Sequence, residues 1–161
     1  MIRKAAFDQD SLEIGTLAKY LDNHPVHQRA YPATSSWGHK GHFEYWLNSG
    51  NDWMYNALNT CAERMVRLAR TFSKKARHPK QTERLLQQCA RELLLAQSSD
   101  WPFIVSNGTS TEYANRRVRD HVSRFHFLAD ALDRGEFPEL ELRALEQMDN
   151  IFPNANWRCY A

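Results

Sequence analysis

Long apolar runs are missing from this chain of 161 residues. The longest aliphatic run, Leu93 to Ala96, is far shorter than the ~20 residues that a membrane-spanning helix needs. The first residues include two basic side chains, but the apolar stretch stops at Asp8, so it does not form the apolar centre of a secretory signal. We therefore expect a soluble protein and, by default, a cytoplasmic location.

Cysteine is also scarce, and neither sign of charge dominates. The chain has an odd number of cysteines at wide spacing, Cys61, Cys89 and Cys159, which argues against a disulfide framework. The first two fall on the apolar stripes of predicted helices, where buried thiols behave as small hydrophobes. The net charge of +2 is too small to indicate an acidic partner from the overall balance alone.

The sequence lacks the motifs of metal, phosphate and triad chemistry. His39 and His42 are spaced like part of a zinc site, but no cysteine pair or helical His-Glu-x-x-His supplies the remaining ligands. Ser36, His39 and Asp52 have the residue types of a catalytic triad without the Gly-x-Ser-x-Gly elbow. Glycine-rich phosphate loops are absent as well. We predict no metal and no cofactor.

Helical periodicity is what the chain does contain. Apolar residues at steps of three and four predict a helix from Asn51 to about Phe72. After a basic link, 74–79, the same spacing predicts a second helix with its stripe over 85–96 and its end near Ser98. These two segments carry most of the predicted core.

Turn signals divide the C-terminal part of the chain. Residues 101–104 are expected to form an apolar turn before the pair Asn107–Gly108. Thr109 and Glu112 fit a capping box at the start of a third helix, which Gly135 is placed to stop. Pro138 suits the first turn of a fourth helix.

The first fifty residues contain repeated glycine and proline interruptions, although Thr16 is placed to cap a short helix through Leu21. We predict an all-α fold in a single helical domain over residues 1–161. It consists of an irregular aromatic arm, 1–50, and a bundle of three to four main helices, 51–161. Because the arm cannot bury itself, it must lie on the bundle or on another body.

Two basic runs leave room for an RNA-associated helical protein. The alternative is that they are solvated helix faces paired with Glu63, Glu83, Glu92 and Asp120, which the near-neutral total favours. No RNA-reading aromatic motif accompanies the arginines, so we predict neither a nucleic-acid nor a membrane partner. The runs comprise Arg64, Arg67, Arg70, Lys74, Lys75, Arg77, Lys80 and Arg84, then Arg116, Arg117, Arg119 and Arg124.

The most informative segment, 35–48, places four aromatic residues and two glycines in what reads as a loop. Loops carry function more often than cores do. Trp37 has no periodic apolar neighbours, which favours an exposed ring, whereas Trp46 lies in a stretch that fits a short helix with one buried side. Core packing is the better interpretation for Trp53 and Trp101. An exposed indole beside small hydroxyls suits a sugar ligand.

Several segments, in their order and spacing, resemble the C-terminal helical domain of family-57 glycoside hydrolases of the alpha-1,4-glucan branching enzyme type. The likeness covers nearly the whole chain. The segments are 35–38, 46–48, 51–53, 90–103 and 149–153.

The resemblance implies a glycosyltransferase that cleaves an alpha-1,4 glucan and reattaches the piece through an alpha-1,6 bond. Such chemistry requires a carboxylate nucleophile and a carboxyl acid/base. In the family both lie in an N-terminal distorted (β/α) barrel, and no Asp or Glu here matches them, so we assign no catalytic residue. The resemblance places Trp37 and Trp46 in the substrate cleft, with Asp100 and Trp101 as further candidates. His39 and Lys40 depart from the family pattern.

Two hypotheses about function follow. The leading one is a substrate-cleft domain of a branching enzyme in glycogen biosynthesis, inactive alone and completed by a barrel in the same or a companion chain. Its partner would be an alpha-glucan such as amylose, glycogen or starch. The alternative is a stand-alone, non-enzymatic glucan-binding or assembly module.

Overall fold

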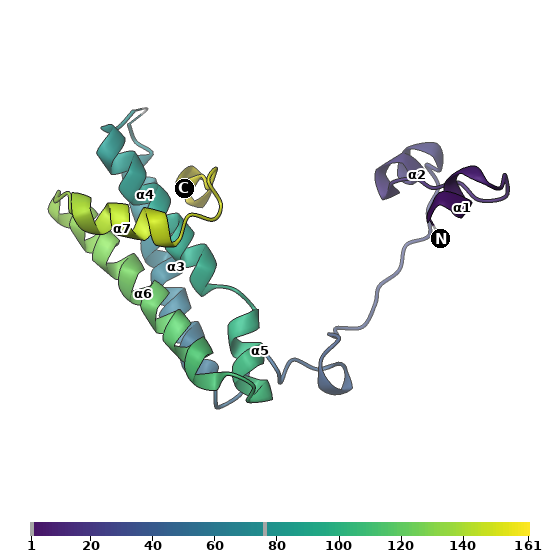
Figure 1. The fold of residues 1–161 in the computed structure, drawn as a ribbon, viewed down its shortest axis with the longest axis horizontal. Helices are drawn as coiled ribbons and strands as arrows, with labels where there is room; N and C mark the ends of the chain where they lie inside the picture. Colours follow the sequence, from purple (N-terminus) through teal and green to yellow (C-terminus); the bar gives the residue numbers. More distant parts are fainter. Residues whose placement is uncertain (1, 76) are drawn as a thin grey trace. The chain divides into compact units, whose positions relative to one another are not determined.

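The computed structural model describes residues 2–75 and 77–161, and these contain helices but no strand. Ala76, in the predicted basic link, lies outside the described residues. The chain divides into two compact units, 1–35 and 36–161 (Figure 1). None of the described helices is long and apolar enough to cross a membrane. The all-α prediction is confirmed.

The first unit contains two short helices, α1 (Ile2–Phe7) and α2 (Leu17–Asn23). Thr16 caps α2 as predicted, since its side-chain oxygen accepts a hydrogen bond from the Lys19 amide at 3.2 Å. No residue of either helix is buried. The described residues of this unit, 2–35, therefore form no core of their own.

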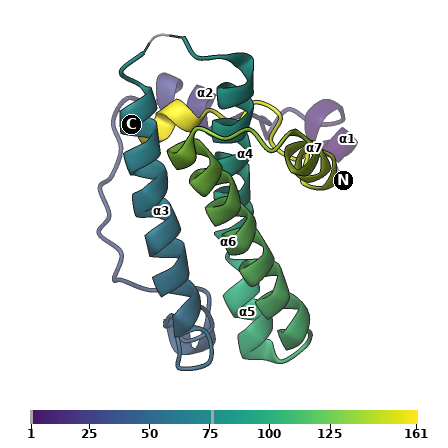
Figure 2. The same cartoon turned by 90° about the vertical axis from the view of Figure 1, so that its left-hand side faces the viewer.

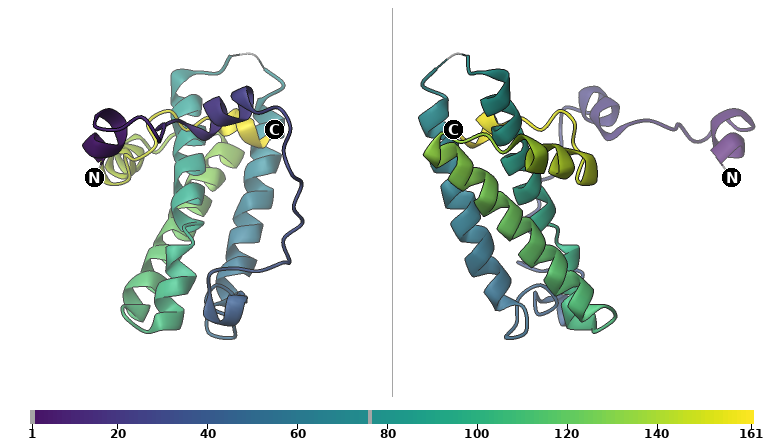
Figure 3. Two further views of the ribbon diagram at one scale, coloured as in Figure 1. Left: turned by 90° about the vertical axis from the view of Figure 1, so that its right-hand side faces the viewer. Right: turned by 60° about the vertical axis from the view of Figure 1, so that its left-hand side comes forward.

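Three long helices form the body of the second unit. Figures 1 and 2 show α3 (Asp52–Phe72), α4 (Lys80–Ala96) and α6 (Thr111–Arg134) running alongside one another, and α4 packs most extensively against α6. The shorter helices are α5 (Asp100–Asn107) and α7 (Glu139–Met148). The final turn, η2 (Trp157–Tyr160), packs on α3 and α4 (Figure 3). The predicted bundle is confirmed.

The core of this unit consists of the predicted apolar stripes. Phe125 and Leu128 of α6 and Leu93 of α4 have no exposed surface, and Met65 fills the same cluster from α3. Burying each large apolar side chain contributes roughly 1.5–3 kcal/mol relative to leaving it in water. Trp157 joins this cluster from the C-terminal end.

Two predictions about helix boundaries are wrong. Residues 101–104 lie inside α5 rather than in a turn. The Thr109–Glu112 capping box does not form, because α6 begins after Ser110 and no side chain caps it. The prediction that Gly135 stops the helix before it is confirmed, since Gly135 follows α6 with a left-handed φ of 68°. Gly108 follows α5 in the same way, with a φ of 70°. At these positions a glycine relieves the strain that a side chain would cause.

The division between the two compact units falls inside the predicted arm, 1–50. Residues 36–50 belong to the same compact unit as the bundle, so the irregular region separate from it ends at Ser35 rather than near residue 50. Whether the two units make up a single domain stays a prediction.

The basic runs are not simply solvated faces. Arg64 of α3 pairs with Asp130 and Asp133 of α6 at 2.5 and 2.7 Å, and Arg84 of α4 pairs with Glu139 and Glu146 of α7 at 3.0 and 2.6 Å. These bonds join different helices and are partly buried, so they fix helix positions. Of the acidic partners expected from sequence, Glu92 is fully buried elsewhere, and Glu83 pairs with Arg158.

The three free thiols should differ sharply in reactivity. Burial raises the pKa of Cys61 to about 11 and raises the pKa of the fully enclosed Cys89 as well, whereas Cys159 is exposed. At pH 8 only roughly one Cys61 thiol in a thousand is then a thiolate. We expect a thiol reagent to modify one cysteine in the folded chain and three after denaturation. Cys159→Ser should abolish the native reaction, and modification of Cys61 in the folded state would contradict the buried placement.

Candidate functional site

Three aromatic rings meet where the 36–50 loop packs on α5. The centroids of Trp37 and Trp46 are 4.9 Å apart with the rings at 86°, an edge-to-face arrangement. Phe103 of α5 lies 5.3 Å from Trp37 and 6.1 Å from Trp46. Trp37 is nevertheless 75% exposed, so it presents one of the largest side chains of the unit to solvent.

These rings border an open hollow of about 520 Å³, within the size range of small-molecule sites. Asp100, at the first residue of α5, contributes its only charged side chain, and Ser36 and Ser99 contribute hydroxyls. The surface thus combines flat apolar faces with a few hydrogen-bonding groups at the edge. The full lining is Ser36, Trp37, Phe43, Trp46, Tyr55, Ser99, Asp100 and Phe103.

Hydrogen bonds to the backbone shape the loop around Trp37. The Ser36 hydroxyl donates to the His42 carbonyl and accepts from the Gly38 amide at 3.0 Å. The Ser36 amide also donates to the Gly41 carbonyl at 2.9 Å. Both bonds of the Ser36 hydroxyl are therefore structural, and the triad combination of Ser36, His39 and Asp52 gains no support from its contacts.

Asn51 anchors the loop to α5 from inside. This fully buried residue accepts from the Asn48 amide at 2.8 Å and donates to the Pro102 carbonyl at 3.2 Å. It also lies 3.1 Å from the Ser106 hydroxyl, which donates to the Tyr45 carbonyl at 2.7 Å. A fully satisfied buried network of this kind rigidifies the segment that carries it.

Gly38 allows Trp46 to approach the loop backbone. A Cβ atom at this position would lie 2.7 Å from the His42 carbonyl oxygen and 2.9 Å from Trp46 Cζ3. We expect Gly38→Ala to displace the Trp46 ring and to destabilise the chain by roughly 1–3 kcal/mol, as overpacking does.

Tryptophan fluorescence and denaturant unfolding would test the Gly38 substitution. Gly15, which has open space at the Cβ position, offers a control through Gly15→Ala. An unchanged emission spectrum for Gly38→Ala would contradict the close approach.

The structure brings three of the four site residues predicted from the sequence together. Trp37, Trp46 and Asp100 border one hollow, whereas Trp101 does not line it. The Trp101 indole N–H donates to the Leu95 carbonyl at 2.8 Å, and its ring lies 6.0 Å from Tyr113. This placement favours a packing role for Trp101.

Sequence reasoning missed Phe103, Tyr55 and Asn51 as members or supports of this site. If a helix had been predicted over Asp100–Asn107, Phe103 would have been placed one turn after Asp100 on the same side of that helix. Signals for that helix were present: Asp100 in the first turn, Pro102 close behind it and Gly108 after the last turn. The polar run from Asn48 to Asn51 gave no comparable signal of burial.

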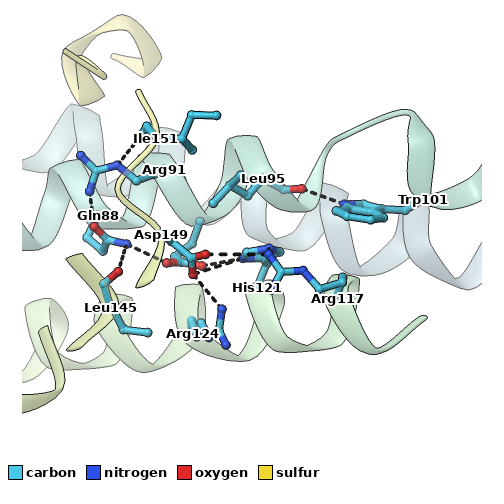
Figure 4. A network of polar contacts seen from close by, with 11 residues as sticks. Gln88, Arg91, Leu95, Trp101, Arg117, His121, Arg124, Leu145, Asp149 and Ile151 are labelled. Atoms are coloured by element: carbon cyan, nitrogen blue, oxygen red, sulfur yellow. Dashed lines mark hydrogen bonds and ion pairs between the residues drawn. The ribbon is translucent and has the colours of Figure 1, made fainter. Parts of the chain in front are cut away.

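A second cluster lies buried between α4, α6 and the segment after α7 (Figure 4). His121 Nδ1 is 2.7 Å from a Glu92 carboxylate oxygen, and both side chains are fully buried. Arg117 approaches His121 Nε2 at 2.9 Å. Because a guanidinium can only donate, Nε2 must accept, which places the histidine proton on Nδ1, facing Glu92.

Glu92, His121 and Asp149 have ligand atoms close enough together to suggest a metal site. Two guanidinium groups already occupy this cluster: Arg124 donates to Asp149 at 2.7 Å, and Arg117 lies 3.8 Å from the same carboxylate. A divalent cation would be repelled by both arginines. The donor set therefore fits an ion-pair network that holds α4, α6 and the C-terminal segment together.

Residues 57–160 match the protein family described as "1,4-alpha-glucan branching enzyme, C-terminal". The chain belongs to this family. The match covers all the long helices of the bundle from the first turns of α3 onward. It corresponds to a C-terminal domain of branching enzymes of glycoside hydrolase family 57.

Individual relatives agree with the assignment. A 1,4-alpha-glucan branching enzyme of Thermococcus kodakarensis is 35% identical over 150 residues, which is 89% of this chain and 22% of that enzyme. Its crystal structure, determined in complex with glucose and additives, superposes with a TM-score of 0.82 at 31% identity over 94% of this chain and 28% of that one.

Two further solved structures share the fold. The branching enzyme of Pyrococcus horikoshii gives a TM-score of 0.78 at 33% identity, covering 92% of this chain and 29% of that one. The alpha-amylase AmyC of Thermotoga maritima gives 0.74 at 38% identity, covering 96% and 27%. The chain thus spans less than a third of the length of each of these relatives.

Proposed function

We propose that this chain forms one wall of the substrate cleft of an alpha-1,4-glucan branching enzyme and holds the glucan for chemistry done elsewhere in the protein. The hollow bordered by Trp37, Trp46, Phe103 and Asp100 carries this proposal. Membership of the branching enzyme family supplies the substrate class, an alpha-glucan such as amylose, glycogen or starch.

The chemistry of the hollow suits a sugar chain. The exposed Trp37 ring offers a flat face for the C–H side of a glucose unit, while the Trp46 ring at 86° to it closes one side. Asp100 and the Ser99 hydroxyl stand at the edge, where sugar hydroxyls need partners. Stacking on such a ring is worth about 1 kcal/mol beyond area burial, by analogy with aromatic pairs.

The hollow does not supply the bond-breaking step. A retaining glycosidase mechanism needs two carboxyl groups about 5–5.5 Å apart across the scissile bond. Asp100 is the single acidic residue in the lining. We therefore assign both catalytic carboxyls to the rest of a full-length enzyme, whose setting would be glycogen biosynthesis in the cytoplasm.

Amylose branching provides the test. The isolated chain should form no alpha-1,6 bonds, whereas a chimera in which it replaces the matched region of the T. kodakarensis enzyme should branch amylose. Branching by the isolated chain, or an inactive but folded chimera, would refute this division of roles.

One observation favours the stand-alone glucan-binding module as a second candidate. The loop that carries Trp37 is ordered by bonds within its own unit, above all those of Asn51, so the hollow does not need a partner to form. Affinity electrophoresis in amylose gels distinguishes the stand-alone module from a cleft-wall domain. Strong retention of the isolated chain together with an inactive chimera would favour the stand-alone module.

A further inference from the structure

The backbone of Trp46 is held from both sides by side chains of two different helices. The Ser106 hydroxyl on α5 donates to the Tyr45 carbonyl, which comes before Trp46, at 2.7 Å. The Tyr55 hydroxyl on α3 donates to the carbonyl of Trp46 itself at 2.5 Å. Each of these carbonyls belongs to one of the two peptide groups that flank the Trp46 Cα atom. Since peptide groups are planar, fixing both of them fixes the backbone dihedral angles of Trp46 and the direction of its Cα–Cβ bond.

The Trp46 ring has little freedom beyond this. It lies so close to Gly38 that a Cβ atom there would be 2.9 Å from Trp46 Cζ3, and the Phe103 ring is 6.1 Å away. A side chain with a fixed Cβ direction and close neighbours is restricted to one of its few staggered rotamers. The hydroxyls of Ser106 and Tyr55 therefore place the ring as well as the backbone.

The Ser106 hydroxyl has no hydrogen-bonding capacity left for a ligand. A hydroxyl offers one donor and two acceptor lone pairs. The donor is used on Tyr45, and the oxygen accepts from Asn48 Nδ2 at 2.8 Å and from Asn51 Nδ2 at 3.1 Å. Ser106 is also not among the described residues that border the hollow. Any effect of Ser106 on the hollow must therefore pass through the segment that it holds.

Helix α5 sets two of the three rings relative to each other. Phe103 and Ser106 are three residues apart on α5, so they lie on the same side of it. Phe103 contributes its own ring, 5.3 Å from Trp37, while Ser106 fixes the backbone that carries Trp46. The Trp37 ring packs at 4.9 Å against the Trp46 ring. A shift of Trp46 would therefore change the aromatic surface that Trp37 helps to form.

Rigidity here serves the hollow more than the core. Trp37 and Trp46 are not members of the buried cluster of the bundle, and Trp37 is 75% exposed. A tryptophan side chain has only two torsions, and a ring that is already held in place loses little entropy when a ligand covers it. The two aromatic rings are thus preorganised for a flat ligand.

We propose that Ser106 and Tyr55 are positioning residues for glucan binding. They hold both peptide groups of Trp46, so that its ring and the Trp37 ring keep the edge-to-face arrangement that a glucose unit meets. This inference rests on the proposed function, because it takes the ligand of the hollow to be an alpha-glucan. Neither hydroxyl needs to contact the sugar for this role.

Ser106→Ala tests the proposal without changing a residue that borders the hollow. Two closely spaced indoles give an exciton couplet in far-ultraviolet circular dichroism, and Trp37→Ala identifies the signal of this pair by removing it. Ser106→Ala should lose most of the couplet, because Trp46 is free to turn. Its retardation in amylose gels should show an affinity lower by at least about threefold, a smaller loss than for Trp37→Ala, since the ring is displaced and not removed.

Gln87→Ala is the matched control. The Gln87 side chain on α4 makes the same kind of bond, to the Pro153 carbonyl at 2.8 Å, outside the hollow. It should lower the melting temperature by roughly 2–4 °C and leave both the couplet and the amylose affinity unchanged. Tyr55→Phe keeps the ring and removes the second bond, so it should also weaken the couplet. This variant decides the question if Ser106→Ala does not fold.

The two readouts separate positioning from glucan binding. An unchanged couplet in folded Ser106→Ala, or an unchanged amylose affinity despite a lost couplet, would overturn the proposal and leave Ser106 a structural residue. A couplet that Gln87→Ala weakens equally would overturn it as well. If the unchanged chain is not retarded by amylose while Ser106→Ala still loses the couplet, the glucan function fails and the positioning of Trp46 stands.

Discussion

Glu92→Gln is expected to lower the free energy of unfolding by roughly 1–3 kcal/mol, the cost of leaving a buried hydrogen-bonding group without its partner. The Glu92 carboxylate accepts from Gln88 and from His121, each at 2.7 Å. A carboxamide has one acceptor oxygen, so one donor would then face an N–H group. The ion pairs of Arg117 and Arg124 with Asp149 should persist in this variant.

Denaturant unfolding of the full chain measures this effect. Glu136→Gln is the matched control, because Glu136 pairs with Arg134 at the surface with 58% of its side chain exposed. Surface pairs of this kind contribute little. Similar losses for the two variants would show that the Glu92 network is not the buried structural element that its contacts indicate.

The helices were predictable because their stripes repeat over many residues. Met65, Phe125 and Leu128 lie on long periodic patterns, and all are fully buried. The short helix α5 was missed because eight residues offer too few repeats for a period to show. The polar core was not predictable at all, since Glu92 and His121 look like surface residues until α4 and α6 are packed together.

Part of the candidate site was predictable because one of its residues interrupts the periodic patterns that predicted the helices. Trp37 stood out because it lacks periodic neighbours, and the structure does leave it exposed. Trp101 was a further candidate through the family resemblance, although core packing was the better interpretation of its sequence position, and its bond to Leu95 turns it toward the bundle. Side-chain direction of this kind depends on a helix that the sequence pattern did not reveal. Asn51 could not be recognised as an anchor without its partners on α5.

Trp37→Ala is expected to weaken amylose binding by the chain at least about tenfold, which corresponds to about 1.4 kcal/mol. The ring is 75% exposed, so its removal should alter the free energy of unfolding little while it deletes the flat face that a glucose unit would cover. Retardation in amylose gels gives the affinity, and denaturant unfolding gives the stability.

Comparison with the other tryptophans separates binding from packing. The Trp46 ring is partly buried against Gly38 and lies 6.1 Å from the Phe103 ring, so Trp46→Ala should reduce both amylose affinity and stability. Trp101→Phe should reduce stability alone, because it removes the bond to Leu95 outside the hollow. If Trp37→Ala binds amylose as tightly as the unchanged chain while Trp101→Phe does not, the binding surface lies on the Tyr113 side of α5 and not in the hollow.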